Sequence, residues 1–589
     1  MLKEKENTWS KKVLLFQRFK KSFMQKLLIN GKKVLSGKIS ISGSKNATLP
    51  ILAATILSNH IKLLNVPLVK DIFTMIKLLK FIGLKIKVFK KKNKIEVKNL
   101  NKKIRTLAPY RLVKTMRAGV LVLGPLLAKY KKAKISLPGG CAIGTRPVDL
   151  HLFALKKLGA KIKIKNGYIV AEAKNGLRGA NITFPSVSVG ATENAILAAF
   201  KATGKTTLNN CAIEPEIIDL ISLLNKLGGN IKVSGRKILI SEHKKIRKKI
   251  IHKIIFDRIE LGTYMIAGAL VGKNIRLNKV NPKIVKKEIS ILKKMGIKLK
   301  IRRSEIQILR SECIKKISLA TKPYPGFPTD LQAQLMVLMT CAKGVSKIKE
   351  NIFENRFMHV QELKRMGADI KIKNKTAFIT GPSKLTGAEV MATDLRASVS
   401  LVLAGLVADN RTIINRIYHL DRGYEFLEKN WKTVKHILKE FKVKAKNLKL
   451  VAKTDEDLRV ISAHLQDSIV SMENIANLKK NKIFLMQLNR FMWEDVERGV
   501  FRKNKRIRTM LKFDNVLEVN SRNINKKNKD KFLDFLAIES RQMPDKNHEM
   551  KLIFSGDLII RIVSEVIEVT LDDQGEPWDT KNKPKHKVL

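Results

Sequence analysis

An internal repeat constrains the fold of this chain more than any other feature of its sequence. In each copy, apolar residues three or four positions apart predict a helix, which is followed by a helix-ending residue and a short alternating strand. The six copies are KLLKFIGLKIKV (77–88), LFALKKLGAKIKI (152–164), LISLLNKLGGNIKV (220–233), EISILKKMGIKLKI (288–301), VQELKRMGADIKI (360–372) and HILKEFKVKAK (436–446). A helix, a glycine and a strand in series are common in α/β proteins, but six copies at nearly even spacing indicate a true repeat.

The spacing of the repeat predicts the architecture. The helix-ending position is held by Gly83, Gly159, Gly228, Gly296, Gly367 and, in the sixth copy, Lys442. Successive copies lie 76, 69, 68, 71 and 75 residues apart. This period is too long for a solenoid, so each copy predicts a small α/β subdomain. Three copies in each globule would give two similar lobes, and a cleft between lobes is a favoured ligand site.

Length and composition predict a multidomain protein without membrane spans. The chain has 589 residues, of which 44% are hydrophobic, and its longest apolar run, residues 118–128, is too short to cross a bilayer. Residues 1–23 lack the apolar core and cleavage site of a signal peptide, so we interpret them as an N-terminal extension. The cysteines lie far apart in the sequence, and we expect reduced thiols and a cytoplasmic location. They are Cys141, Cys211, Cys313 and Cys341.

The net charge of +68 has two interpretations. A charge of this size is typical of nucleic-acid-binding proteins. However, lysines recur along the whole chain among many isoleucines and asparagines, and aromatic residues make up only 6%. We therefore expect no specific nucleic-acid partner, and we interpret the excess as a compositional background that helps to attract anionic substrates.

Two motifs place cations where an anion can reach them. In ISGSKNATLPIL (41–52), Lys45 and Asn46 follow a Gly-Ser turn at the start of an apolar helix. This pattern also fits a capped helix with a surface lysine. In TMRAGVLVLGPLLA (115–128), Arg117 interrupts an apolar helix. Because an unpaired buried guanidinium is costly, we expect Arg117 to face an anion or the cleft.

A glycine-rich segment, ISLPGGCAIGTRPVDLH (135–151), surrounds Cys141. A free cysteine is usually a small buried hydrophobic residue. Here the neighbouring Pro138 and Gly139 predict an open loop instead, and Arg146 would lower the pKa of the thiol. The segment therefore predicts a reactive cysteine.

Two further motifs begin helices. FPSVSVGATENAIL (184–197) is a turn of small residues before a helix, whose N-terminal N–H groups suit an anion. In YPGFPTDLQAQ (324–334), Asp330 follows Pro-Thr at a predicted helix start. The simplest interpretation of Asp330 is a helix cap, and a role in proton transfer is the alternative.

Together, the repeat and the motifs resemble the enolpyruvyl transferase family over residues 24–446, and among its members those that act on UDP-N-acetylglucosamine. The resemblance implies an α/β fold, a two-lobed inside-out α/β barrel with three of the six repeated units in each lobe. One lobe would hold residues 24–44 and 257–446, and the other residues 45–256 with the cysteine loop. Residues 447–589 resemble a small bacterial family of unknown function, and their pattern predicts a C-terminal α+β domain.

The resemblance also implies a role for each motif residue. Cys141 would be the general acid and Asp330 the base that faces the sugar 3'-hydroxyl. The phosphoenolpyruvate ligands would be Lys45, Asn46, Arg146, Arg396 and Arg422. The UDP-N-acetylglucosamine ligands would be Arg117, Arg146, Pro147, Val148, Asp149, Leu150, Ser186, Val187, Ser188, Val189, Asp330 and Ile352. Two positions depart from the family pattern, namely Ser186, where some members carry Lys, and Phe256, where Pro is expected.

The implied reaction moves the enolpyruvyl group of phosphoenolpyruvate to the 3'-hydroxyl of UDP-N-acetylglucosamine and releases phosphate, without a metal or organic cofactor. It would be the first committed step of peptidoglycan synthesis, with consequences for cell shape and division, and a target of fosfomycin. The nearest alternative is 5-enolpyruvylshikimate-3-phosphate synthase, against which the cysteine loop and FENRFMH (353–359) argue. The sequence also leaves open a nucleic-acid-binding protein and an inactive regulatory paralogue.

Overall fold

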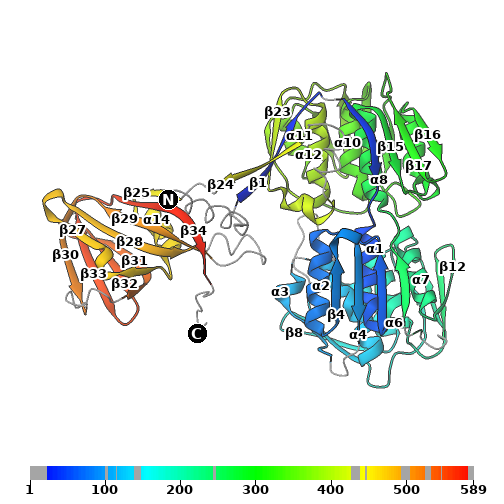
Figure 1. The fold of residues 1–589 in the computed structure, drawn as a ribbon, viewed down its shortest axis with the longest axis horizontal. Helices are drawn as coiled ribbons and strands as arrows, with labels where there is room; N and C mark the ends of the chain where they lie inside the picture. The colour runs from blue at the N-terminus through cyan, green and yellow to red at the C-terminus, as the bar shows by residue number, and fades with distance from the viewer. Residues whose placement is uncertain are drawn as a thin grey trace, which may run out of the picture. The chain divides into compact units, whose positions relative to one another are not determined.

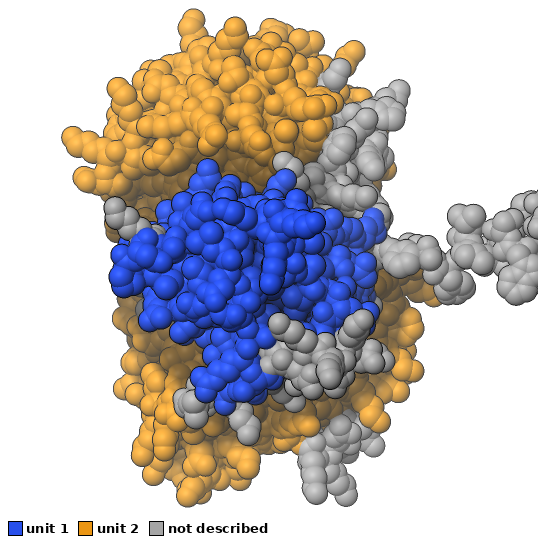
Figure 2. Space-filling model, turned by 90° about the vertical axis from the view of Figure 1, so that its left-hand side faces the viewer, with its two compact units in different colours: residues 1–22, 444–589 blue, residues 23–443 orange. Residues whose placement is uncertain are grey.

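The computed structural model describes residues 23–32, 34–99, 104–114, 116–137, 148–242, 247, 249–425, 438–444, 448–492, 505–523, 532–545 and 547–580. The chain divides into two compact units, residues 23–443 and residues 1–22 with 444–589, which are coloured separately in Figure 2. Across the described ranges, no helix is both long and apolar enough to cross a membrane.

Residues 23–443 form two lobes, seen one above the other in Figure 1, each with its own hydrophobic core. The core of the central lobe runs from Ala47 to Ile254. The core of the terminal lobe combines residues 27–41 with residues 256–424. The chain therefore enters the central lobe once and returns once.

Within the described part of these lobes, the strands form six four-stranded sheets, three in each lobe. In the central lobe, the first sheet consists of β3 (His60–Leu64), β4 (Lys85–Phe89), β5 (Lys94–Lys98) and β14 (Ile250–Lys253). The second consists of β6 (Leu107–Ala108), β7 (Lys132–Ser136), β8 (Lys161–Lys165) and β9 (Tyr168–Glu172). The third consists of β10 (Asn181–Thr183), β11 (Thr206–Asn209), β12 (Asn230–Ser234) and β13 (Lys237–Ser241). In the terminal lobe, the first sheet consists of β2 (Leu35–Ser40), β15 (Gly272–Asn278), β16 (Leu299–Arg302) and β17 (Glu305–Leu309). The second consists of β18 (Ser318–Ala320), β19 (Gly344–Lys349), β20 (Asp369–Lys373) and β21 (Thr376–Gly381). The third consists of β1 (Phe23–Asn30), β22 (Glu389–Met391), β23 (Arg411–Asn415) and β24 (Leu438–Lys444). Each of these six sheets contains a parallel pair, such as β10 with β11 or β18 with β19, so the sequence repeat is a repeat of topology.

The predicted helix ends are confirmed for five of the six copies. The helices are α2 (Lys70–Ile82), α5 (Asp149–Lys157), α7 (Pro215–Lys226), α9 (Lys286–Lys294) and α11 (Val360–Arg365). The glycine that follows each one has a positive φ, for example 126° at Gly83 and 94° at Gly367. The prediction for the sixth copy is wrong at Lys442, which lies inside strand β24, because the alternation of FKVKAK favours an extended chain over a helix end.

The innermost helices of each lobe are buried on nearly all sides. They are α1 (Lys45–Ala54), α4 (Leu123–Tyr130) and α6 (Val189–Ala199) in the central lobe, and α8 (Arg258–Val271), α10 (Gln332–Thr340) and α12 (Leu395–Val407) in the terminal lobe. Helices that are apolar all round belong in a core. With helices inside and sheets outside, the predicted inside-out arrangement is confirmed.

Among its described residues, the C-terminal unit combines one α-helix, α14 (Asp455–Leu465), and two short 3₁₀ helices with a ten-stranded sheet. Leu458, Ile461 and Leu465 turn the apolar face of α14 into the core formed with the sheet. The strands are β25 (Lys449–Ala452), β26 (Ile469–Ser471), β27 (Ile475–Leu478), β28 (Ile483–Phe491), β29 (Lys505–Phe513), β30 (Val516–Arg522), β31 (Phe532–Gln542), β32 (His548–Phe554), β33 (Leu558–Ser564) and β34 (Val569–Asp579). This unit has the predicted α+β composition.

Candidate active site

The two segments that cross between the lobes, residues 42–44 and 255–257, lie side by side next to the candidate active site. The N–H of Ser44 donates to the carbonyl of Ile255 at 2.7 Å, and that of Asp257 donates to the carbonyl of Ser42 at 2.9 Å. A Cβ atom at Gly43 would lie 1.7 Å from the carbonyl oxygen of Asn65, so the Ser-Gly-Ser turn requires glycine there. This pairing places the starts of α1 and α8 next to each other.

Lys45 is the first residue of α1, whose N-cap Ser44 accepts a hydrogen bond from the N–H of Ala47. The expectation of a capped helix is therefore confirmed, but the lysine is buried and not on the surface. Its backbone N–H donates to Asp257 at 3.3 Å, and its Nζ donates to Asp71 Oδ2 at 3.2 Å. Burial lowers the pKa of Lys45, and Asp71 opposes this change most strongly.

Asp71 joins the two lobes. It lies in the first turn of α2, in the central lobe, and its Oδ1 is 3.0 Å from Nε of Arg422. Arg422 ends a 3₁₀ helix of the terminal lobe, Ile417–Arg422. The structure therefore brings together Lys45 and Arg422, two residues that the resemblance assigns to phosphoenolpyruvate, through an aspartate that sequence reasoning missed.

Asp330 lies between two arginines. Its Oδ1 is 3.0 Å from Nη2 of Arg356, and its Oδ2 is 3.3 Å from Nη2 of Arg396. Asp330 belongs to a short 3₁₀ helix before α10 and does not cap that helix with its side chain. The simplest sequence interpretation, a helix cap, is therefore wrong, because the carboxylate turns to the two guanidinium groups.

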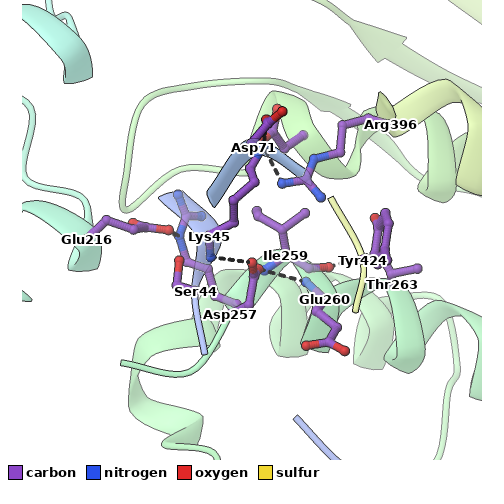
Figure 3. A network of polar contacts seen from close by, with 12 residues as sticks. Ser44, Lys45, Asp71, Glu216, Asp257, Ile259, Glu260, Thr263, Arg396 and Tyr424 are labelled. Carbon is purple, nitrogen blue, oxygen red and sulfur yellow. Dashed lines mark hydrogen bonds and ion pairs between the residues drawn. The ribbon is translucent and has the colours of Figure 1, made fainter. Parts of the chain in front are cut away.

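Arg396 comes from the first turn of α12 and is 4% exposed. Its guanidinium stacks over the ring of Tyr424 at 5.5 Å. Burial by itself would lower the pKa of Arg396, but Asp330 and Tyr424 raise it above its usual value. Arg396 is therefore a permanent cation in the site, and Figure 3 shows it in one polar network with Lys45 and Asp71.

Two further acidic residues, Asp257 and Glu260, belong to this network. Asp257 caps α8 by accepting from the N–H groups of Ile259 at 2.9 Å and Glu260 at 3.0 Å (Figure 3). Burial raises the pKa of Glu260 to about 8, and the nearby Asp257 adds to the shift. Glu260 also accepts hydrogen bonds from the N–H and the hydroxyl of Ser42. The acidic residues in FDRIELGT (256–263) could have indicated site residues from the sequence alone, but they were not among the predicted ones.

The residues assigned to the nucleotide sugar lie mainly around the starts of α5 and α6. Asp149 begins α5, Ser188 caps α6 by accepting from Ala191 N–H at 3.4 Å, and Val189 is 38% exposed. His151 of α5 hydrogen-bonds to Asn194 of α6 at 3.1 Å. Val148 precedes α5, Leu150 is its second residue, and Ser186 and Val187 precede the cap of α6.

Arg117 and Ile352 come from other elements. Arg117 begins a 3₁₀ helix, Arg117–Val122, and lies close enough to His151 to affect its charge. Burial, with a contribution from Arg117, lowers the pKa of His151 to about 4, so this histidine is neutral at pH 7. Ile352 belongs to the terminal lobe, follows β19 and is 36% exposed. Asn46, the residue after Lys45, is half-buried.

Cys141, Arg146 and Pro147 lie outside the described residues. Of the other cysteines, Cys211 is buried, and burial raises the pKa of its thiol to about 12. Burial also raises the pKa of Cys341, whereas Cys313 is exposed. No cluster of His, Cys, Asp and Glu suited to a metal ion occurs in the part of the chain that the structure describes.

Comparison with known proteins divides the chain in two. Residues 29–431 match the family described as EPSP synthase (3-phosphoshikimate 1-carboxyvinyltransferase), and residues 448–586 match a family described as a protein of unknown function. Among solved structures, the enolpyruvyl transferase NikO from Streptomyces tendae is similar with a TM-score of 0.64 and 21% identity, covering 72% of this chain and 100% of that one. EPSP synthase from Acinetobacter baumannii has a TM-score of 0.57 and 18% identity, covering 71% and 100%. These two structures establish the fold.

Curated relatives are much closer in sequence. UDP-N-acetylglucosamine 1-carboxyvinyltransferase of Pelagibacter ubique (strain HTCC1062) is 59% identical over 412 residues, which cover 70% of this chain and 98% of the relative. The enzyme of the same name from Rickettsia akari (strain Hartford) is 50% identical over 407 residues, covering 69% and 97%. These relatives and the confirmed inside-out fold show that the chain belongs to the enolpyruvyl transferase family, in the branch of the UDP-N-acetylglucosamine 1-carboxyvinyltransferases.

Proposed function

We propose that this protein transfers the enolpyruvyl group of phosphoenolpyruvate to the 3'-hydroxyl of UDP-N-acetylglucosamine and releases phosphate. The observation that carries the proposal is the convergence of Lys45, Arg396 and Arg422 from both lobes around Asp330 and Asp71. It occurs in a chain 59% identical to an enzyme of that name. A donor with a phosphate and a carboxylate needs several cations, and the guanidinium fork suits both groups.

The proposed residues account for each bond change. The 3'-oxygen attacks C2 of phosphoenolpyruvate while Asp330 takes its proton, and Cys141 delivers a proton to C3. The Cys141 thiolate left by this step takes a proton back from C3 of the tetrahedral ketal as phosphate leaves C2, which restores the double bond in the enolpyruvyl ether. Arg396 and Lys45 stabilise the negative charge of the phosphate through both steps.

We assign the remaining substrate contacts by the same resemblance. Asn46, Arg146 and Arg422 would bind phosphoenolpyruvate. The nucleotide sugar would be held by Arg117, Arg146, Pro147, Val148, Asp149, Leu150, Ser186, Val187, Ser188, Val189, Asp330 and Ile352. Because His151 is neutral at pH 7, Arg117 is the cation of this pair that would bind the diphosphate.

The charge distribution supports anionic substrates. Residues 447–589 hold 27 lysines and arginines against 22 acidic residues, a net charge of +5 within the chain total of +68. Lysines and arginines are thus spread along the whole chain, as expected, but acidic residues offset them in this segment, so the net excess lies almost entirely in residues 1–446. A basic surface around a site accelerates the approach of anions.

Its place in the cell follows from the proposed reaction. We propose a cytoplasmic enzyme of peptidoglycan synthesis that contributes to cell-wall biogenesis, cell shape and the division cycle, and that is inhibited by fosfomycin. We assign none of this chemistry to the C-terminal unit, which matches a family of unknown function.

Phosphate release provides the test. Purified full-length protein should release phosphate from phosphoenolpyruvate with UDP-N-acetylglucosamine, and neither with shikimate 3-phosphate nor without an acceptor. Asp330→Asn, which preserves side-chain shape, should lose this activity. Turnover with shikimate 3-phosphate alone would contradict the proposal.

A further inference from the structure

The Asp71 carboxylate contacts one cation from each lobe. Its Oδ2 is 3.2 Å from Lys45 Nζ, and its Oδ1 is 3.0 Å from Arg422 Nε. The Asp71 side chain is 8% exposed and that of Lys45 is 10% exposed, so the lysine contact lies largely out of water. Coulomb interactions are stronger there than on the surface.

An acidic side chain is unexpected in a site for a substrate with an anionic phosphate and an anionic carboxylate, because it repels the substrate. It also cannot donate a hydrogen bond to phosphate in its ionised form. Asp71 lies in the first turn of α2, where acidic side chains commonly stabilise a helix. A role in helix stability alone would not require the carboxylate to meet Lys45 and Arg422.

The charges around Lys45 suggest a different role. Burial lowers the pKa of Lys45, and the nearby Arg396 and Arg422 lower it further. Asp71 is the strongest opposing influence, and Asp330 is the second. Lys45 is thus a buried amine beside two guanidinium groups, and without Asp71 it would tend to lose its proton and with it the attraction for phosphate.

We propose that Asp71 is a positioning residue, which holds the Lys45 ammonium and the Arg422 guanidinium together as a preformed receptor for phosphoenolpyruvate. This inference rests on the proposed function, because it takes Lys45 and Arg422 as ligands of that substrate. Asp71 also links the lobes, since its two partners belong to different ones. Losing the carboxylate would therefore affect phosphoenolpyruvate and leave the binding of the nucleotide sugar nearly unchanged.

The first experiment measures Lys45 directly and does not depend on turnover. The full-length protein and Asp71→Asn are labelled with an amine-reactive reagent across a pH series, and the labelling of Lys45 is followed by mass spectrometry. We expect Lys45 of the variant to become reactive at least about one pH unit lower than in the wild type. Glu96→Gln, which removes the negative charge from a 2.7 Å contact with His60 in the same lobe, should leave the Lys45 profile unchanged. An unchanged profile in Asp71→Asn would overturn the proposal.

The second experiment separates positioning from folding. In steady-state kinetics, Asp71→Asn should raise KM for phosphoenolpyruvate at least about tenfold and change KM for UDP-N-acetylglucosamine less than about twofold. The alkaline limb of kcat/KM for phosphoenolpyruvate should move to lower pH, and Asp71→Glu should partly restore it. Equal losses for both substrates with an unshifted limb would indicate a structural role and refute the proposal. If the wild-type protein showed no turnover but Asp71→Asn still shifted the labelling profile of Lys45, the result would contradict the proposed function instead.

Discussion

Arg396 Nη2 lies 3.3 Å from Asp330 Oδ2, and Arg356 Nη2 lies 3.0 Å from the other oxygen of the same carboxylate. Both oxygens of the proposed base therefore have a cationic partner. Charge-assisted hydrogen bonds from two guanidinium groups hold this carboxylate in place. A substrate phosphate that binds Arg396 would compete with Asp330 for that guanidinium.

Arg396→Gln tests this relationship. Because Arg396 is buried, permanently charged and shared between Asp330 and the proposed phosphate site, the variant should lose at least about 100-fold in kcat/KM for phosphoenolpyruvate. Arg365→Gln removes an exposed arginine from α11 and should retain wild-type activity. Kinetics of Arg396→Gln within about twofold of the control would show that Arg396 is not a ligand of the donor.

Cys141 should be the most reactive thiol of the four. Cys211 and Cys341 are held in their neutral forms by burial, and Cys313 has no cation that the structure pairs with it among the described residues. Fosfomycin should therefore modify Cys141 and stop turnover, as judged by mass spectrometry and phosphate release. Cys141→Ala should lose most activity. Cys141→Asp should retain a proton donor and resist the epoxide, whereas an adduct elsewhere with Cys141 unmodified would contradict the assignment.

Glu260 predicts a pH dependence of stability. Its pKa in the folded protein is about 8, against 4.5 for the ordinary carboxyl, so the folded state binds the proton more tightly. Its stabilising effect is complete below about pH 4.5 and is lost as the pH rises through about 8. Glu260→Gln, which cannot ionise, should be less sensitive to pH than the wild type in urea unfolding followed by circular dichroism. Parallel curves for the two proteins between about pH 5 and about pH 8 would exclude this role.

The enzyme unit should work without its C-terminal neighbour. The hydrophobic cores of the two lobes contain no residue beyond Tyr424 among those described, so residues 24–446 should fold and retain most activity. A point variant tests the same independence in the full chain. Asp573→Asn removes the negative charge that lies 2.6 Å from the fully buried Arg490 and should destabilise the C-terminal unit by about 3–5 kcal/mol. Phosphate release should be unaffected, and its parallel loss would show that the units depend on each other.

Edge-strand lysines should keep the lobes monomeric. Strand β8, with the sequence KIKIK, lies at the edge of its sheet and leaves Ile164 60% exposed. Charged residues on an edge strand oppose pairing with another chain. Lys163→Val should therefore promote association at high concentration, measured by light scattering, whereas Lys163→Glu should not. Lys174→Val, in an exposed loop of the same lobe, is the matched control, and equal scattering by both valine variants would disprove the effect.

Local features of this protein could be predicted from its sequence, because neighbouring residues decide them. The glycines after α2, α5, α7, α9 and α11 adopt positive φ, as the repeat predicts. In KLIFSGDLIIRIV (551–563), the turn residues Ser555, Gly556 and Asp557 between two apolar runs predict a hairpin, which forms between β32 and β33. One local prediction was wrong in part. The polar sequence EPWDTKNKPKHKVL (576–589) predicts a loop or tail, but β34 continues to Asp579 because Trp578 pairs with Arg506 of β29, which is distant in sequence.

The sequence by itself determined the six-fold repeat, the helix starts and the residue types in the motifs, since each depends on a few adjacent positions. Only the tertiary structure decided which charges meet. Asp71 and Arg422 are 351 residues apart, and Asp330 turns from a cap position to Arg356 and Arg396. No local pattern specifies such partners. Charged groups buried by the packing of two lobes need opposite charges, and the fold alone brings those charges within reach.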